Sequence, residues 1–381
     1  MRILFIAGAS SATVFALAPL ATAVRQAGHH VVMAATQEMM PVVAGVGLPG
    51  IPVTAKGIPD FASKDRSGNP LPVPRTPAEQ MHHTGGWFAR MAAESLVPLL
   101  ELSACWRPDV IVGGTMSYAA PLLAARLRVP YVRHAWDAME FAAMDAGAQE
   151  ELLPELTELG LAGLPEPDLF IDISPPSIRP PHGQPVQPMR WTPGNTQRQL
   201  EPWMYTKGEQ PRICITSGSR VTPGQEVDQN YDFLRASIQE FLSLGAELVV
   251  AAPEAAAEAL SAETAGGVRI GWVPLDVLAP TCDLIVHHGG GVTSLTAVNA
   301  GVPQLVVPKA ANFVTAARRL EELGAATVLL PGRDSPELMA KTAGGMLADA
   351  AHRTAAGALA REMARMPLPS AVVGVLERLT C

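Results

Sequence analysis

Short apolar runs alternate with segments of helical spacing along most of this 381-residue chain. The apolar runs are rich in Val, Ile and Leu, as in strands that are buried on both faces of a parallel sheet. The segments between them repeat apolar residues every three or four positions, which is typical of amphipathic helices. Alternation on this scale predicts an α/β fold with parallel sheets covered by helices on both faces.

The expected elements follow from these two patterns and from the Gly and Pro residues that separate them. The expected strands are Ile3–Ala7, His30–Ala34, Val110–Gly113, Tyr131–Arg133, Leu169–Ile173, Arg212–Thr216, Glu247–Ala251, Val268–Gly271, Leu284–Val286, Gln304–Val307 and Ala326–Leu330. The expected helices are Thr13–Ala27, Gly86–Cys105, Ser117–Leu127, Asp137–Leu159, Asp228–Leu244, Glu254–Ala262, Val292–Asn299, Ala311–Leu323, Ser335–Ala348, His352–Met366 and Leu368–Leu379. A break in the fourth helix is expected near Gly147 and Pro154, and Lys56–Thr84 is expected to be a long loop.

Two domains are expected from the chain length and from one proline-dense stretch, Pro175–Pro211, which has little periodicity. We expect a first domain over residues 1–190, a linker over 191–211, a second domain over 212–366, and a C-terminal helix over 367–381 that packs back toward the first domain. Parallel sheets bind ligands at the carboxyl ends of their strands, and two such domains enclose a cleft.

The N-terminus imitates a secretory signal, because Arg2 precedes an apolar run that extends to Ala23. The segment Gly8–Thr13 interrupts this run, and Gly28 separates it from a further apolar strand. The order of strand, loop, helix, glycine and strand favours a βαβ unit over a signal peptide.

Composition argues against several classes of partner. The net charge of −8 and the scattered basic residues argue against nucleic acid. No stretch is long and apolar enough for a membrane-spanning helix, so stable membrane insertion is not expected. The four cysteines lie far apart without metal-ligand spacing, which is typical of reduced thiols in a cytoplasmic protein. A homodimer is compatible with the sequence.

One junction between a strand and a helix carries the main functional signal. His287, His288 and three glycines follow the buried strand Leu284–Val286, and a helical pattern begins at Val292. A glycine turn lets the backbone approach an anion, and the N-terminus of the helix offers unpaired N–H groups and the positive end of its dipole. A histidine adds a hydrogen-bond donor for phosphate. The alternative is a buried strand followed by a glycine turn without a catalytic role.

Trp272 follows another expected strand and offers a flat face on which a base can stack. Trp272-Val273-Pro274, Asp283, the turn His287–Thr293 and the segment Gly301–Gln304 together resemble the nucleotide-sugar box of family 1 glycosyltransferases, the GT-B enzymes that decorate antibiotics. The resemblance covers the whole chain. It implies two Rossmann-like domains with parallel sheets facing across a deep cleft, an N-terminal domain that binds the acceptor and a C-terminal domain that binds the nucleotide sugar. The donor-binding residues it implies are Ser219, Arg220, Trp272, Val273, His288, Gly289, Gly290, Gly291, Val292, Thr293, Asn312 and Phe313.

Three of these positions depart from the family pattern. Val292 replaces a usual glycine, a change that keeps the backbone N–H. Asn312 and Phe313 replace an Asp-Gln pair that binds sugar hydroxyls in the family. The loss of that carboxylate and amide implies a sugar with fewer hydroxyls, such as a dideoxyhexose, and such sugars are typically carried on TDP in antibiotic pathways. Ser219 and Arg220 lie in a turn that contacts the phosphates in relatives; a simple polar turn is the alternative.

The catalytic candidates are Asp137, Ser10 and Thr13. Many relatives have a histidine base in the loop after the first strand, and Thr13 occupies that position here without being a strong base. Ser10 lies in the same loop and is expected to reach the donor diphosphate. Asp137 follows the strand Tyr131–Arg133 and is the candidate base; the alternative, which is compatible with the first role, is that it caps the next helix. His82, Trp87 and Met91 are expected to line the acceptor site, as is Glu79, although a stripe such as Trp87 and Met91 is often ordinary core.

A carboxylate base suits a phenolic acceptor, because deprotonation makes a ring carbon ortho or para to the oxygen nucleophilic. In these features the chain most resembles the aromatic-polyketide C-glycosyltransferases of the angucycline, urdamycin type. The resemblance implies an inverting transfer, independent of metal and cofactor, of an olivose-like deoxysugar from a TDP-sugar to a carbon of an aromatic polyketide. The alternatives are an O-glycosyltransferase of the same pathways, a GT-B sugar-nucleotide epimerase, or a non-catalytic helper protein.

Overall fold

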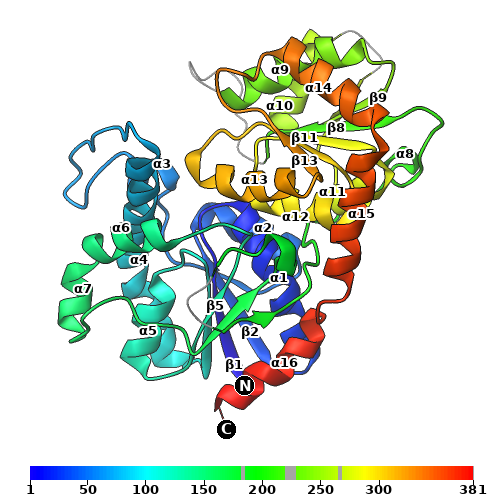
Figure 1. Cartoon of the computed structure of the whole chain (residues 1–381). Helices are drawn as coiled ribbons and strands as arrows, with labels where there is room; N and C mark the ends of the chain where they lie inside the picture. Colours follow the sequence, from blue (N-terminus) through cyan, green and yellow to red (C-terminus); the bar gives the residue numbers. More distant parts are fainter. Residues whose placement is uncertain (182–184, 219–228, 265–267, 381) are drawn as a thin grey trace. The chain divides into compact units, whose positions relative to one another are not determined.

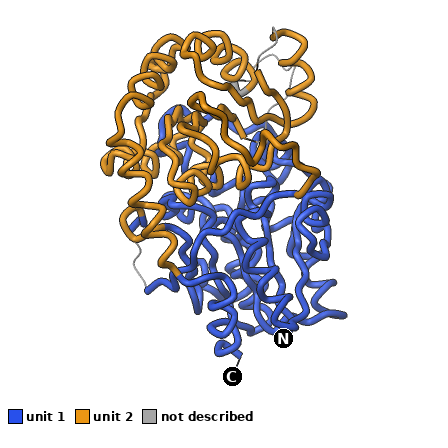
Figure 2. Tube along the Cα trace, turned by 90° about the vertical axis from the view of Figure 1, so that its right-hand side faces the viewer, with its two compact units in different colours: residues 1–174, 179–196, 367–381 blue, residues 175–178, 197–366 orange. Residues whose placement is uncertain are grey.

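The computed structural model describes residues 1–181, 185–218, 229–264 and 268–380 (Figure 1). The chain divides into two compact units, which Figure 2 colours separately. The first unit comprises Met1–Ser174, Arg179–Thr196 and Pro367–Cys381, and the second comprises Pro175–Ile178 and Gln197–Met366. Residues 191–196, which the sequence assigns to a linker, pack in the first unit, where the Trp191 side chain is only 1% exposed.

Within the described residues, the first unit contains a seven-stranded parallel sheet in the order β3-β2-β1-β4-β5-β6-β7. The strands are β1 (Arg2–Ile6), β2 (His30–Ala35), β3 (Gly50–Pro52), β4 (Val110–Gly114), β5 (Tyr131–His134), β6 (Leu169–Asp172) and β7 (Gln187–Pro188). The helices are α1 (Ser11–Gln26), α2 (Met40–Gly45), α3 (Ile58–Ala62), α4 (Pro77–Cys105), α5 (Ala119–Leu127), α6 (Ala142–Glu151), α7 (Leu153–Glu158) and α16 (Pro369–Glu377). Helix α16 packs against α1 in this unit.

The second unit contains a six-stranded parallel sheet in the order β10-β9-β8-β11-β12-β13 within the described part of the chain. The strands are β8 (Arg212–Thr216), β9 (Glu247–Ala251), β10 (Arg269–Gly271), β11 (Leu284–His287), β12 (Gln304–Val306) and β13 (Ala326–Val328). The helices are α8 (Pro202–Tyr205), α9 (Gln229–Leu242), α10 (Glu254–Glu263), α11 (Leu275–Leu278), α12 (Gly291–Ala300), α13 (Val314–Glu322), α14 (Pro336–Ala348) and α15 (Ala350–Ala364). The prediction of two Rossmann-like domains is confirmed.

Both sheets are covered on both faces by largely apolar cores. In the first unit Ile3, Leu4 and Phe5 are consecutive and fully buried, because the side chains of a strand point alternately to two faces that are both covered. In the second unit one core lies on each side of the sheet: Ile213 and Ile215 contribute to one, and Cys214 contributes to the other. Every expected strand is present, and the short strands β3 and β7 were not predicted. No described helix combines the length and the apolar character that a membrane crossing needs.

The predicted long loop over 56–84 is wrong in part, because it contains the short helix α3 and because α4 begins at Pro77 instead of Gly86. A capping box starts this helix: Thr76 Oγ1 accepts from the Glu79 backbone N–H at 3.2 Å, and the Glu79 carboxylate accepts from the Thr76 N–H at 3.1 Å. Glu79 therefore caps a helix, a role that differs from the acceptor lining expected of it.

The predicted helix over 137–159 begins only at Ala142; it is divided beside Pro154, as expected, but not at Gly147. Helix α6 passes through Gly147 and ends before Leu152, and α7 begins with Pro154 in its first turn. Gly147 is needed for close packing, since a side chain there would lie 2.1 Å from the backbone oxygen of His82 on α4. The missing side chain lets the two helices cross closely.

Candidate functional site

The ring of His288 lies at the carboxyl ends of three strands of the second unit. Thr216 of β8 pairs in register with His287 of β11, so the turns that follow these strands are neighbours. A methyl group on Gly218 would lie 2.8 Å from His288 Cε1, and one on Gly290 would lie 2.6 Å from its Nε2. Real Cβ atoms do not approach so closely, so both positions need glycine, and Gly218 also has a positive φ of 82°.

The third side of this cradle comes from the segment after β12. The Phe313 ring meets the His288 ring edge to face, with centroids 5.7 Å apart. A side chain on Gly289 would lie 2.9 Å from Phe313 Cβ. Three segments that are far apart in sequence therefore form one continuous surface. They contribute Gly218, the turn His288–Gly290 and Phe313.

His287 is a buried residue whose hydrogen bonds stay within the protein. Its Nδ1 accepts from the Gly289 backbone N–H at 3.1 Å, so its Nε2 carries the proton and donates to Gln304 Oε1 at 2.9 Å. The same Gln304 oxygen accepts from Ser294 Oγ at 2.9 Å. Burial lowers the pKa of His287 to about 4, and the bond to Gln304 offsets this only in part. The neutral ring joins the glycine turn, β12 and the first turn of α12.

Helix α12 begins directly at the glycine turn, with Gly290 as its N-cap residue. The first bond of the helix runs from the Ser294 N–H to the Gly290 oxygen, at 3.0 Å. The N–H groups of Gly291, Val292 and Thr293 precede it and have no acceptor within the helix. They present donors and the positive end of the helix dipole, which together suit a phosphate. Val292 keeps its N–H, so its departure from the glycine pattern does not remove a donor.

Trp272 directly follows β10, at the edge of the sheet, and its side chain is partly buried. Val273 is 7% exposed and belongs to the core beneath β8 and β11, so its side chain points away from a ligand and only its backbone is available. Asn312 lies beside Phe313 in a short 3₁₀ turn before α13, and both are partly buried. Ser219 and Arg220 lie outside the described residues.

In the first unit, the loop after β1 is closed by Thr13. The Thr13 hydroxyl accepts from the Gly8 N–H at 3.0 Å and donates to the Ser10 oxygen at 2.7 Å. The threonine hydroxyl thus holds the loop, at the position where the family resemblance implies a histidine base. Ser10 is the N-cap residue of α1, and its side chain makes no capping bond.

Asp137 lies just beyond the carboxyl end of β5 and is partly buried. Burial raises the pKa of Asp137 to about 6, the charge of Asp172 adds to this rise, and the bond from the Met139 N–H to Oδ1 at 2.9 Å opposes it. The alternative role as a helix cap is wrong, because α6 begins at Ala142 with Phe141 as its N-cap. A carboxylate that gains and loses its proton near neutral pH is suited to general base catalysis.

An aromatic group adjoins the loop that holds Thr13. The rings of Phe88 and Trp136 have centroids 5.6 Å apart, and Trp87 stacks on Phe88 at 3.7 Å. A side chain on Gly8 would meet Phe88 at 3.3 Å, so this group borders the loop after β1. Sequence reasoning named Trp87 and did not name Trp136, although the position of Trp136 directly before Asp137 was a signal for it.

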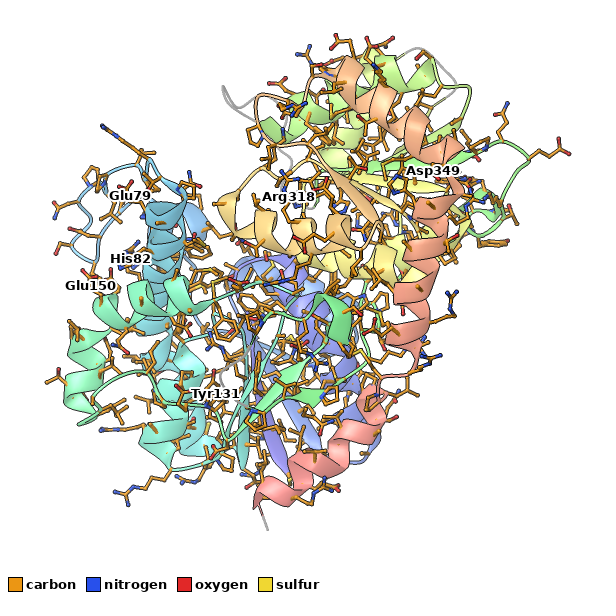
Figure 3. All side chains as sticks on the ribbon, in the orientation of Figure 1. Glu79, His82, Tyr131, Glu150, Arg318 and Asp349 are labelled. Carbon is orange, nitrogen blue, oxygen red and sulfur yellow. The ribbon has the colours of Figure 1, made fainter. Side chains whose placement is uncertain are left out.

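The other two acceptor candidates differ in exposure. Met91 is 6% exposed and lies on the buried face of α4, which is the ordinary core role foreseen as its alternative. His82 is half exposed, and its Nε2 lies 3.2 Å from Glu150 Oε2 on α6 (Figure 3). Neither observation joins His82 to the aromatic group, and its place in an acceptor site stays a prediction.

Comparison with known proteins places this arrangement in a family. The model of the erythromycin biosynthesis protein CIII-like N-terminal domain matches residues 78–218, and that of the corresponding C-terminal domain matches residues 235–379. L-demethylnoviosyl transferase of Streptomyces niveus is 34% identical over 98% of this chain and 96% of its own length. Aclacinomycin-T 2-deoxy-L-fucose transferase of Streptomyces galilaeus is 29% identical over 100% of this chain and 96% of its own.

A solved structure extends the likeness to the fold. The crystal structure of the Streptomyces sp. SF2575 glycosyltransferase SsfS6, complexed with thymidine diphosphate, superposes with a TM-score of 0.88 at 35% identity and covers 99% of both chains. The relatives and the solved structure agree along nearly the whole chain, and the two family models match residues 78–218 and 235–379. The protein therefore belongs to the erythromycin biosynthesis protein CIII-like family of GT-B antibiotic glycosyltransferases, and it is a glycosyltransferase.

Proposed function

We propose that this enzyme transfers an olivose-like deoxysugar from a TDP-sugar to a ring carbon of an aromatic polyketide, with inversion at the sugar. The observation that carries the donor half of this proposal is the cradle of Gly218, Gly289 and Gly290 around His288, closed by Phe313. In this proposal the second unit binds the donor and the first unit binds the acceptor.

The diphosphate would bind at the N-terminus of α12 and beside His288. Fixed N–H donors stabilise the negative charge that grows on the diphosphate as the bond to the sugar breaks, without a cost of reorientation at that moment. Thymine would stack on Trp272. The complex of SsfS6 with thymidine diphosphate, at 35% identity, supports TDP as the carrier.

The identity of the sugar rests on Phe313 and Asn312. The ring of Phe313 lies against His288, so an apolar face borders the expected position of the sugar. A hydroxyl placed against this face would lose its hydrogen bonds to water without replacement, and a sugar that lacks the hydroxyl avoids this cost. The name of the Streptomyces galilaeus relative, a 2-deoxy-L-fucose transferase, supports a deoxysugar.

The acceptor step would use Asp137 and the aromatic side chains of the first unit. The carboxylate takes the phenolic proton, and the electron density moves to a ring carbon ortho or para to the oxygen. That carbon attacks the anomeric carbon from the face opposite TDP, and the bonding electrons to the leaving oxygen depart with TDP. The proton on the attacked carbon then passes to water, which restores the aromatic ring, and Asp137 returns its proton to the phenolate oxygen. Thr13 leaves no histidine base in the loop after β1, which supports the role of Asp137.

The test is a product analysis with TDP-olivose and a phenolic polyketide aglycone. A product that survives acid hydrolysis and lacks one aromatic proton signal would support transfer to carbon. A product that acid cleaves to free sugar would overturn the carbon linkage and leave an O-glycosyltransferase. TDP binding without any product, across a panel of aglycones, would favour the helper protein.

A further inference from the structure

The indole of Trp272 is held from one side by Arg198, a residue 74 positions earlier in the chain. The guanidinium carbon of Arg198 lies 4.5 Å from the centroid of the indole ring. Its Nη1 donates to the Trp272 backbone oxygen at 3.3 Å, and its Nη2 forms an ion pair with Glu254 Oε1 on α10. All of these groups belong to the second unit.

We propose that Arg198 is a positioning residue for the nucleotide base, which it serves by fixing the indole of Trp272. This inference rests on the proposed TDP-sugar donor. A guanidinium over one face of the ring leaves the opposite face as the stacking surface, so it decides on which side the base binds. It also restricts rotation of the indole before the nucleotide arrives, and preorganisation of this kind improves affinity without a direct contact.

The geometry does not fit a mere surface ion pair. The Arg198 side chain is 38% exposed and that of Glu254 is 73% exposed, and an ion pair at such exposure contributes little to folding. Three simultaneous contacts nevertheless hold the planar guanidinium: the indole face, the Trp272 oxygen and the Glu254 carboxylate. A lysine offers a point charge and cannot reproduce the planar fork that makes these contacts together.

The experiment compares three ligands that differ in the base. Titration calorimetry would give the affinity of the full-length protein for TDP, thymidine and inorganic pyrophosphate. Arg198→Ala is expected to lower the affinities for TDP and for thymidine by a similar factor of about 5 to 10. The affinity for pyrophosphate should not change. Arg198→Lys should recover part of the loss. Arg235→Ala, which removes an arginine from an exposed pair with Asp232 on α9, is the matched control and should change none of the three.

A double-mutant cycle separates positioning from general destabilisation. In a Trp272→Ala background, Arg198→Ala should have no further effect on thymidine affinity, because the side chain that it positions is absent. The inference would be overturned if Arg198→Ala lowered pyrophosphate affinity as much as TDP affinity. It would also be overturned if Arg198→Ala still lowered thymidine affinity in the Trp272→Ala background. Wild-type protein that bound neither TDP nor thymidine would overturn the proposed donor and this inference together, whereas wild-type affinity retained in Arg198→Ala would overturn this inference alone.

Discussion

His287 Nε2 lies 2.9 Å from Gln304 Oε1, and this contact joins the strand before the glycine turn to the strand beside it. Both side chains are buried, at 0% and 1% exposure. Because the other ring nitrogen of His287 accepts from the Gly289 N–H, the tautomer of the ring is fixed. The proposed phosphate site therefore rests on a buried, neutral hydrogen-bond relay that does not itself meet the ligand.

Replacing His287 should damage the turn that this relay supports. His287→Leu leaves the Gly289 N–H without its acceptor and removes one of the two donors to Gln304 Oε1, which should cost about 1–3 kcal/mol of unfolding free energy. Urea denaturation measures this loss. TDP affinity should fall more than thymidine affinity if the turn holds the phosphates as proposed; an equal fall for both ligands would contradict this account of the relay.

A side chain on Gly290 should displace His288. Gly290→Ala places a methyl group 2.6 Å from His288 Nε2, so either the ring or the turn must move. We expect TDP affinity to fall at least about tenfold, as for the loss of one charge-assisted hydrogen bond. Gly345→Ala on α14 is the control: its methyl group meets nothing within 4 Å, and it should stabilise the helix slightly without changing TDP binding. TDP binding by Gly290→Ala at wild-type strength would contradict the phosphate role of this cradle.

Asp137→Asn should separate catalysis from donor binding. If Asp137 is the base, the variant should lose about 10²–10⁴-fold in transfer rate and keep its TDP affinity. Since the pKa of Asp137 is raised to about 6, wild-type kcat/KM should rise with pH up to about 6 and then level off as the carboxylate becomes the dominant form. Glu140→Gln changes an exposed carboxylate nearby and should leave the pH profile intact. Turnover at wild-type rate in Asp137→Asn would mean that another group takes the proton.

The sugar preference should respond to Phe313. The double substitution Asn312→Asp with Phe313→Gln introduces the polar pair that the family resemblance implies for sugar hydroxyls. We expect the ratio of kcat/KM for TDP-glucose to that for TDP-olivose to rise by about 10–100-fold, since a buried hydroxyl would regain its partners. An unchanged ratio, with TDP binding intact, would show that these residues do not contact the sugar.

Acid should destabilise the fold through its buried histidines. Burial lowers the pKa of both His134 and His287 to about 4, below the ordinary value near 6.5. Between these two values the unfolded chain binds protons on these rings and the folded chain does not, so the free energy of unfolding falls as pH drops through that window. Asp137 acts in the opposite direction: its raised pKa removes stability as pH rises from about 3.8 toward 6. His134→Gln should flatten the pH dependence by up to about 1.4 kcal/mol per pH unit, measured by urea denaturation at pH 4.5, 5.5 and 7, with the exposed His30→Gln as control.

Local pattern determined much of this protein. Buried parallel strands need continuous apolar runs, so each expected strand is present, and the order of turn and helix residues at His287–Thr293 carried the phosphate hypothesis. Strands β3 and β7 escaped prediction because they contain only three and two residues. Such short segments show no recognisable run or alternation of apolar residues. The start of α4 at Pro77 was missed although Thr76 and Glu79 form a recognisable capping box.

Tertiary packing decided the rest, because contacts between distant segments leave no local signal. The low helix propensity of glycine suggested a break at Gly147. In the structure the lack of a side chain at Gly147 instead lets α4 and α6 pack closely where they cross. The pKa of Asp137 depends on burial and on the charge of Asp172, and neither follows from the sequence around it. Arg198 meets Trp272 only after folding brings residues 74 positions apart together. The sequence by itself determined the strands and the chemistry available at their ends, and the folded chain decided which of those groups touch, since contact depends on the register and packing of whole elements.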